Sequence, residues 1–438
     1  MKYISTRVGS ATGKTPLSFR QAVFSGLPPD GGLYVPAEQP DLRARIAGFT
    51  EQTSFIEIAE AVFGRLIGDE LRPEAIRRVC ERAFTFEPAL QSLEENLTLL
   101  ELFHGPTCAF KDFGAAFLAA VMEEFLVQEN RRAVILVATS GDTGSAVARA
   151  FQGKANIEVV ILYPSGRVSA LQEQQLTTVG GNVTALEIQG SFDDCQRMVK
   201  EAFVDSELRR SVSLSSANSI NLGRLLPQAL YYIYGNCRLG SGKKRMVCVP
   251  SGNFGNLTAG VYAWLWGMEV DGFIAATNTN DVVPEYLSTG EFRPRRSLKT
   301  ISNAMDVGYP SNFERLIVVF EGSVRKMRKR IKGVSITDME TRDTMRRVYE
   351  ESGMLIDPHT AVGVLASRRY REGSRFDGQI LSLATAHPGK FVDVVRQATG
   401  AAPDLPATLR KAMDKKKQAI PLEPSLERLR EFLLGSYT

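Results

Sequence analysis

Residues 133–151 read AVILVATSGDTGSAVARAF, and this stretch decides the expected fold. Positions 133–138 are apolar without alternation, which is typical of a strand that is buried on both faces of a parallel sheet. A glycine-rich turn follows and leads directly into a helical pattern. In an open α/β sheet, ligands bind where a strand ends and a helix begins. The stretch therefore predicts a fold class and also one edge of a site for an anionic group.

The same pattern recurs along the chain. Further short apolar runs alternate with helical stretches, and they lie at 157–165, 183–189, 245–251, 272–278 and 380–386. Apolar strands separated by helices predict an α/β fold with two three-layer lobes and mostly parallel sheets. Because a helical stretch at 222–234 divides the runs into two clusters, we expect a cleft between two lobes.

The first part of the chain has a different pattern. Residues 54–67 show helical spacing after the turn-rich stretch GLPPDGGLYVP at 26–36. We expect a small, mainly helical leading domain that packs against the two lobes as a structural or gating element. The expected boundaries are 1–90 for this domain and 91–438 for the region of the two lobes, with a smaller mobile lobe at about 107–218 and a large lobe formed mainly by 219–438.

Composition removes several function classes. The 438-residue chain is 44% hydrophobic with a net charge of +4, so it can bury a sizeable core and has no strong charge imbalance. The basic runs 325–332 and 414–418 lack interleaved aromatic residues, and we expect both on solvated helix faces without a nucleic-acid role. No stretch has the apolar length of a membrane span or signal peptide. We therefore expect no nucleic-acid or membrane partner.

Cysteine and histidine usage point to a cytoplasmic protein without a metal site. The five cysteines are scattered and form no CxxC pair, which argues against disulfides and favours a reducing compartment. The three histidines, His104, His359 and His387, lack metal-ligand spacing. For His387, which follows the last apolar run, we favour a structural role over contact with a cofactor.

The strongest chemical signal is a lysine in an apolar setting. Lys111 stands between two phenylalanines in HGPTCAFKDFGAAF at 104–117, where a helix is expected to begin with Asp112 as its cap. Phe113, Phe117, Ala120 and Val121 mark one apolar face of that helix. Desolvation and the helix dipole disfavour the ammonium form of such a lysine, and a neutral amine is a nucleophile.

A second glycine-rich turn lies in PSGNFGNLTAGVYAWL at 250–265. Gly252 and Gly255 allow the backbone to approach a ligand closely, which suits a phosphate. Neither glycine turn has the P-loop or GxGxxG pattern, so nucleotide binding is disfavoured. A nucleophilic lysine together with a phosphate cradle indicates a Schiff base to pyridoxal 5'-phosphate.

Seven segments in order resemble the threonine synthase family of the bacterial and fungal kind, among the fold type II pyridoxal-phosphate enzymes, which share the tryptophan synthase β-like fold. These segments cover almost the full length of the chain, and they are 26–36, 103–114, 138–146, 218–228, 251–256, 302–315 and 384–391.

The resemblance implies a role for individual residues. Lys111 carries the cofactor and is the catalytic residue. The implied cofactor-binding residues are Lys111, Asp142, Gly252, Asn253, Phe254, Gly255, Asn256 and Thr385. The implied substrate-binding residues are Ser140, Gly141 and Thr143, for the α-carboxylate, and Ser219, Asn221 and Arg224, for the substrate phosphate.

Two of these positions have a physical consequence. Thr385 places a hydroxyl against the pyridine nitrogen, which makes the cofactor a weaker electron sink than a carboxylate would. Asp142 stands where many relatives have asparagine beside the phenolic oxygen of the cofactor. An ionised aspartate repels a phenolate unless the two share a proton.

The implied reaction is conversion of O-phospho-L-homoserine and water to L-threonine and phosphate, the last step of threonine biosynthesis, by a carbon–oxygen lyase. We expect a monomer or weak homodimer with a small-molecule substrate. The alternative is a threonine-synthase-like phospho-lyase or serine/threonine dehydratase, which shares the lysine and the loops but releases a 2-oxo acid. The phosphate-binding residues argue against a dehydratase but not against the phospho-lyase. A catalytically silent metabolite-binding protein is disfavoured because Lys111 is present.

Overall fold

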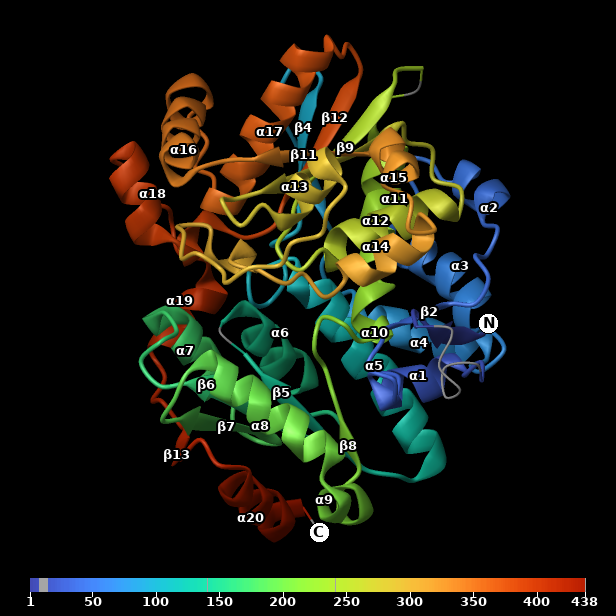
Figure 1. Ribbon diagram of the computed structural model, residues 1–438, viewed down its shortest axis with the longest axis vertical. Coiled ribbons are helices and arrows are strands. Elements are labelled where there is room, and N and C mark those ends of the chain that lie inside the picture. Colours follow the sequence, from blue (N-terminus) through green and yellow to red (C-terminus); the bar gives the residue numbers. More distant parts are fainter. Residues whose placement is uncertain (8–14, 140, 241, 438) are drawn as a thin grey trace.

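The computed structural model describes residues 1–7, 15–139, 141–240 and 242–437. Two sheets stand at the two ends of the molecule, each covered by helices (Figure 1). This arrangement confirms the expected α/β fold with two lobes. The six apolar runs that were expected to be strands all form strands, and each lies within two residues of its predicted bounds.

The larger sheet has six strands, and all neighbouring pairs are parallel except β3 with β4. Its order is β11 (Ile331–Ser335), β10 (Gly272–Thr277), β9 (Arg245–Pro250), β12 (Gln379–Ala384), β4 (Leu97–Glu101) and β3 (Ala89–Glu94). The helices of this part of the chain are α10 (Leu222–Leu225), α11 (Gln228–Arg238), α12 (Gly255–Leu265), α13 (Val282–Thr289), η1 (Asn303–Met305), α14 (Phe313–Val319), α15 (Val324–Arg330), α16 (Asp338–Ser352), α17 (Pro358–Ser374), η2 (Pro388–Lys390), α18 (Val392–Thr399) and α19 (Ala407–Met413).

The smaller sheet has five strands, which all pair in parallel. Its order is β13 (Ile420–Leu422), β7 (Val183–Ile188), β6 (Ile157–Pro164), β5 (Ala133–Ala138) and β8 (Leu214–Ser215). Its helices are α6 (Asp142–Phe151), α7 (Ala170–Thr177), α8 (Phe192–Val204), α9 (Ser206–Ser211) and α20 (Leu426–Tyr437).

The end of the chain returns to the smaller sheet and so is a part of 219–438 that does not belong to the large lobe, which was expected to be formed mainly by these residues. β13 pairs with β7, and α20 packs against α8 and α9. Before β13, the run 414–418 is exposed and forms a turn and irregular chain rather than a helix. Lys417 from this run lies 2.7 Å from Glu173 and 2.8 Å from Glu187. Ion pairs of Lys417 therefore attach this run to the smaller lobe, and the expectation that the run lies on a helix face was wrong.

The other basic run, 325–332, also differs from its expectation. Its first part belongs to α15 and is largely exposed, as expected, but the helix ends at Arg330 and the run continues into β11. Ile331 is buried at this point, because β11 pairs with β10 at the edge of the larger sheet. A basic run gives no strand signal, which explains the error.

The leading part of the chain contains β1 (Tyr3–Ser5), α1 (Phe19–Ser25), β2 (Tyr34–Pro36), α2 (Arg43–Ala47), α3 (Phe55–Ile67) and α4 (Pro73–Ala83). Its helices pack on α5 (Lys111–Glu129), which also contacts α6 and α10. The four predicted core residues of α5 are all fully buried. Since its other faces are buried as well, α5 is a central helix and not an amphipathic one.

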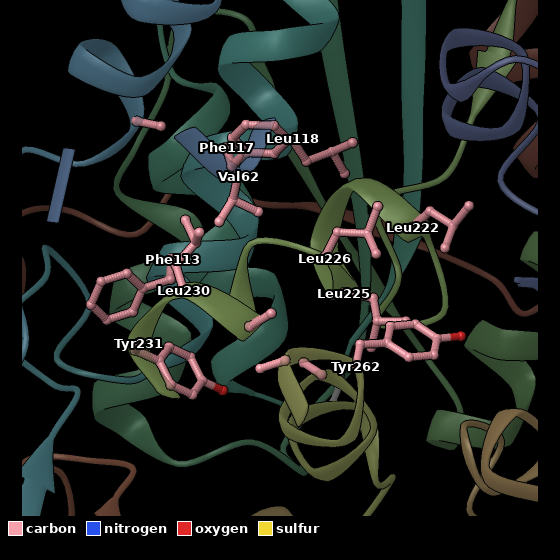
Figure 2. Close-up of a cluster of buried hydrophobic side chains, with 14 of the residues drawn as sticks. Val62, Phe113, Phe117, Leu118, Leu222, Leu225, Leu226, Leu230, Tyr231 and Tyr262 are labelled. Carbon is pink, nitrogen blue, oxygen red and sulfur yellow. The ribbon is translucent and has the colours of Figure 1, made fainter. Parts of the chain in front are cut away.

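Side chains of α5 join the leading helices to the catalytic region (Figure 2). Phe117 stacks on Phe63 of α3 with ring centroids 3.9 Å apart, and Leu118 lies in the same cluster as Leu222 and Leu226. This cluster fixes the position of the helix that begins with Lys111.

The substitution Phe117→Ala is expected to lower the free energy of unfolding by about 3–5 kcal/mol, because it leaves a cavity between stacked aromatic rings. Urea denaturation followed by circular dichroism measures the change. Val127→Ala on the same helix is the control, since Val127 is 55% exposed. Equal urea midpoints for the two variants would contradict a contribution of this cluster to the free energy of unfolding.

Among the described residues, none of the helices combines the length and apolar content that crossing a bilayer requires.

Candidate active site

Lys111 begins α5 beside the carboxyl end of β12. The amide of Phe110 donates to the carbonyl of Thr385 at 2.9 Å, and the amide of His387 donates to the carbonyl of Cys108 at 3.1 Å. These bonds hold the lysine segment against the end of the strand. They place Thr385, which is buried, next to the chain that carries Lys111.

Asp112 does not cap α5, which corrects the sequence expectation. The helix begins at Lys111, so Asp112 lies inside its first turn. The Asp112 carboxylate accepts hydrogen bonds from the Thr107 amide at 2.8 Å and from the Thr107 hydroxyl at 2.6 Å. Asp112 therefore closes the turn that precedes the helix.

Asp142 is the nearest carboxylate to Lys111. Its Oδ2 lies 3.5 Å from Lys111 Nζ, and its Oδ1 lies 2.8 Å from Lys390 Nζ. Gln172 Nε2 donates to the same Oδ1 at 3.1 Å. The carboxylate thus stands between two ammonium groups, and its side chain is only 4% exposed.

The electrostatics of this cluster follow from burial and charge. Burial lowers the pKa of Lys111, and the charges of Lys390 and Arg224 act in the same direction while Asp142 opposes them. Burial by itself raises the pKa of a carboxyl, but Lys390, Lys111 and Gln172 hold the pKa of Asp142 well below its ordinary value. Asp142 is therefore a carboxylate at neutral pH, beside a lysine that gives up its proton more readily than usual.

The first glycine turn joins β5 to α6. The Thr139 hydroxyl accepts hydrogen bonds from the amides of Gly141 at 3.1 Å and Gly144 at 2.9 Å, which shapes the turn. A Cβ on Gly141 would lie 2.6 Å from Gln172 Nε2. Thr143 lies in the first turn of α6 and is partly exposed. The predicted substrate residue Ser140 lies outside the described residues.

The second glycine turn joins β9 to α12. Phe254 has a left-handed backbone with φ +60°, and the helix begins at Gly255. Asn253 Nδ2 donates to Ser219 Oγ at 2.9 Å, and Asn253 Oδ1 accepts from the amide of Ser311 at 2.6 Å. Asn256 bonds within the turn, since it accepts from Ser251 Oγ at 2.6 Å. These hydrogen bonds hold the turn in place, and the bond to Ser219 links the predicted cofactor loop to the predicted phosphate segment.

Gly252→Ala is expected to weaken cofactor binding about 10-fold or more, because the new Cβ would overpack the cradle by at least about 1 kcal/mol. That Cβ would lie 2.7 Å from Met305 Cα and 2.9 Å from Ala304 O. Titration of the cofactor-free protein with pyridoxal phosphate, followed by absorbance, measures the affinity. Gly64→Ala is the control, since a Cβ on Gly64 meets nothing within 4 Å. Unchanged affinity in Gly252→Ala would contradict the cradle.

Arg224 is the cationic group of the phosphate segment. Its Nη1 donates to Ala217 O at 2.9 Å, and its buried Nε has no hydrogen-bond partner among the described residues. Burial lowers the pKa of Arg224 to about 10, so the guanidinium is charged at neutral pH. A Cβ on Gly114 of α5 would lie 2.5 Å from Arg224 O, which shows how closely this segment packs on the helix of Lys111.

Asn221 is engaged by the protein at both ends of its amide. Its Nδ2 donates to Val23 O at 2.9 Å and to Ser216 O at 2.8 Å, while its Oδ1 caps α10 by accepting from Gly223 N at 2.9 Å. It is fully buried. These bonds fix the start of the helix that carries Arg224, and the expected contact of Asn221 with the substrate stays a prediction.

Sequence reasoning missed several residues that support the site. Lys390 and Gln172 contact Asp142, and His359 Nε2 accepts from the amide of Ala304 at 3.1 Å, behind Gly252. Arg315 donates to Tyr34 O at 2.9 Å and to Ile220 O at 2.7 Å. Two of these residues could have been found from the sequence. Lys390 lies in the segment 384–391 and Arg315 in the segment 302–315, and both segments carry the resemblance.

His387 has the structural role that was favoured from the sequence. Its Nδ1 accepts from the amide of Gly389 at 3.0 Å and so caps η2. Among the described residues, no cluster of three or more His, Cys, Asp or Glu side chains has the arrangement of a metal site.

Three family models match the chain. The model of pyridoxal-phosphate dependent enzymes matches residues 86–386, that of the threonine synthase N terminus matches 2–84, and that of the threonine synthase C-terminal part matches 360–433. Together they span nearly the whole chain.

Individual relatives agree with these models. The threonine synthase of Serratia marcescens is 40% identical over 421 residues, which is 96% of each chain. The crystal structure of pyridoxal-phosphate-bound threonine synthase from Brucella melitensis superposes with a TM-score of 0.93 at 38% identity over 99% of each chain. The structure from Escherichia coli gives a TM-score of 0.89 at 39% identity over 99% of this chain and 100% of that one. With identity at this level along its full length, the chain belongs to the threonine synthase family of pyridoxal-phosphate-dependent enzymes.

Proposed function

We propose that this protein converts O-phospho-L-homoserine and water to L-threonine and phosphate, the last step of threonine biosynthesis. The observation that carries the proposal is the position of Arg224. Its buried guanidinium packs beside the helix of Lys111 with an Nε that has no partner among the described residues. A buried, charged donor without a partner suits a substrate that brings its own phosphate.

Pyridoxal 5'-phosphate is the cofactor of the family, and the residues present fit it. Gly252 leaves a space that a Cβ would fill, and the amides that follow it begin α12, where an anion is stabilised. We propose that residues 252–256 hold the cofactor phosphate, Lys111 its carbonyl carbon and Thr385 its ring nitrogen. When bound, the cofactor supplies the electron sink that acidifies the α- and then the β-hydrogens of an amino acid.

Lys111 is the proposed base of the reaction. With the substrate amine in its place on the cofactor, Nζ would take the proton from the α-carbon, pass it on to the conjugated system that the cofactor would supply, and then, neutral again, take one from the β-carbon. The lowered pKa of Lys111 supports this role, because a base must be neutral before it accepts a proton. The C–O bond at the γ-carbon then breaks and phosphate leaves with the bonding electrons. One of the two protons goes to the γ-carbon and the other returns to the α-carbon by way of Lys111, while water adds its hydroxyl at the β-carbon and its remaining proton leaves with the phosphate.

Positioning carries much of the rate enhancement, because a β-hydrogen is barely acidic. We propose that Gly141 and Thr143, together with Ser140, hold the substrate α-carboxylate at the start of α6. Arg224 and Ser219 hold the phosphate at the other end. Asn253 supports this arrangement, since its hydrogen bond to Ser219 couples the cofactor cradle to the substrate phosphate.

The experiment is an NMR assay of the cofactor-loaded protein with O-phospho-L-homoserine, in which phosphate and the organic product are followed together. The proposed function predicts phosphate and L-threonine in equal amounts. Phosphate with 2-oxobutyrate instead would identify a phospho-lyase. Absence of phosphate release would contradict both.

We propose further that the protein works in the cytoplasm as a monomer or weak homodimer, without a nucleic-acid or membrane partner. The free cysteines support a reducing compartment. We also propose that residues 1–90 act as a structural element of the site. The hydrogen bonds from Asn221 to Val23 O and from Arg315 to Tyr34 O support this, because Asn221 lies in the phosphate segment and Arg315 also donates to Ile220 O of that segment.

A further inference from the structure

Lys390 is a buried charge that the reaction described above does not use. Its side chain is 1% exposed, and its Nζ lies 2.8 Å from Asp142 Oδ1 and 2.9 Å from Thr107 O. The η2 turn capped by His387 holds it in place directly after β12. A lysine in this position loses almost all of its hydration, so burying its charge costs free energy.

Asp142 transmits the effect of Lys390 to the reaction centre. One carboxylate oxygen contacts Lys390, and the other lies 3.5 Å from Lys111 Nζ. A neutral amide at position 142 has only one acceptor oxygen, so it could accept from Lys390 and Gln172 but would turn a second donor toward Lys111. The Asp142–Lys390 ion pair therefore produces an electric field at Lys111 that a neutral amide would not produce.

The remaining charged groups near Lys111 are few. Arg224 approaches from α10, and Asp112 faces the same cluster through Thr107. Burial raises the pKa of Asp112 to about 6, with the hydrogen bonds from Thr107 opposing it. Asp142 and Lys390 are the two charged groups that form a direct ion pair in this cluster, so they dominate the local field.

We propose that Asp142 is the counter-ion of Lys111 and that the buried charge of Lys390 partly neutralises it, so that this charged pair sets the proton affinity of the bond between Lys111 and the cofactor. The proposal rests on Lys111 being the cofactor lysine, as in the proposed function. It assigns Asp142 to the lysine side of the cofactor, and it gives a reason for an aspartate where an asparagine would suffice as a hydrogen-bond donor.

The signs of the two charges give opposite expectations. Lys390→Gln removes a positive charge near the Lys111 nitrogen, so that nitrogen holds its proton more tightly and its titration midpoint rises. Asp142→Asn removes the counter-ion, so the midpoint falls. Each change is expected to move the midpoint by about one to two pH units. A merely structural role would not move the midpoint in opposite directions.

The test is a pH titration of the cofactor absorption band in the resting, cofactor-loaded protein without substrate. Lys390→Gln is expected to shift the midpoint upward, Asp142→Asn downward, and Lys390→Arg to stay near the original value because the charge is retained. Lys154→Gln is the control, since Lys154 forms an ion pair with Glu123 at 3.3 Å that does not include Asp142. Circular dichroism and cofactor content verify that each variant is folded and loaded.

Several outcomes would overturn the proposal. These are an unchanged midpoint in Lys390→Gln, a shift in the same direction as Asp142→Asn, or a band that stays in one form from about pH 5 to about pH 10 in every variant. If Lys390→Gln does not fold, the double variant with Asp142→Asn removes both charges and must titrate higher than Asp142→Asn alone. Failure of the proposed function is distinguishable, because it appears in the NMR assay as a missing L-threonine product, whereas the titration is made on the resting protein without substrate.

Discussion

Lys111→Ala is expected to lower kcat by at least about 10³-fold, since the variant loses both the group that holds the cofactor and the base that moves its substrate protons. The cofactor absorption band that reports a bond to lysine is expected to disappear as well. The fold should persist, because the helix that begins at Lys111 is held by Phe113, Phe117 and their neighbours. Stopped-flow kinetics and absorbance spectra of the purified variant measure both effects.

The control for this variant is Lys154→Ala, which removes a lysine of equal side-chain exposure from an ion pair that does not include Asp142. Its kcat and spectrum are expected to match those of the unchanged protein. Retention of the band in Lys111→Ala would contradict the assignment of Lys111 and would require another lysine to carry the cofactor.

Arg224→Met is expected to lower kcat/KM for O-phospho-L-homoserine by about 30- to 5,000-fold, because loss of a buried, charge-assisted contact costs about 2–5 kcal/mol. Cofactor content should stay near that of the unchanged protein. Inorganic phosphate should lose its inhibition of the variant in parallel. Steady-state kinetics with phosphate as a competitive inhibitor measure both constants.

Arg224→Lys separates charge from geometry, since lysine cannot bind phosphate in a bidentate manner and should recover only part of the loss. Arg149→Met on α6 is the control, because Arg149 is exposed and bonds to Gln152. An unchanged inhibition constant for phosphate in Arg224→Met would contradict the phosphate role of Arg224, even if activity fell.

Much of the fold was predictable because its strands are buried on both faces. Such strands give continuous apolar runs, and 133–138, 245–250 and 272–277 were recognisable for this reason. The strands β1 to β4, β8, β11 and β13 were not predicted. Three of them have weak local signals, since β8 and β13 are very short and β11 begins inside a basic run. Their existence depends on the neighbours with which they pair, which a local pattern does not reveal.

The candidate site was predictable where chemistry and local sequence coincide. Lys111 and the turn at 252–256 were identified from glycine, aromatic and lysine placement, and the structure gives both a matching local geometry. Asp112 was misassigned as a helix cap, because its side chain instead accepts from the amide and the hydroxyl of the nearby Thr107. Lys390 was missed because its partner Asp142 is remote in sequence, so only the fold brings the two charges together.

The most direct test of the proposed reaction is to run it in ¹⁸O-labelled water and analyse both products by mass spectrometry. Elimination of phosphate followed by hydration predicts one ¹⁸O atom in the β-hydroxyl of L-threonine and none in the released phosphate, because the C–O bond breaks. Label in the phosphate, together with unlabelled homoserine, would show cleavage of the P–O bond and would contradict the assigned roles of Lys111 and Arg224.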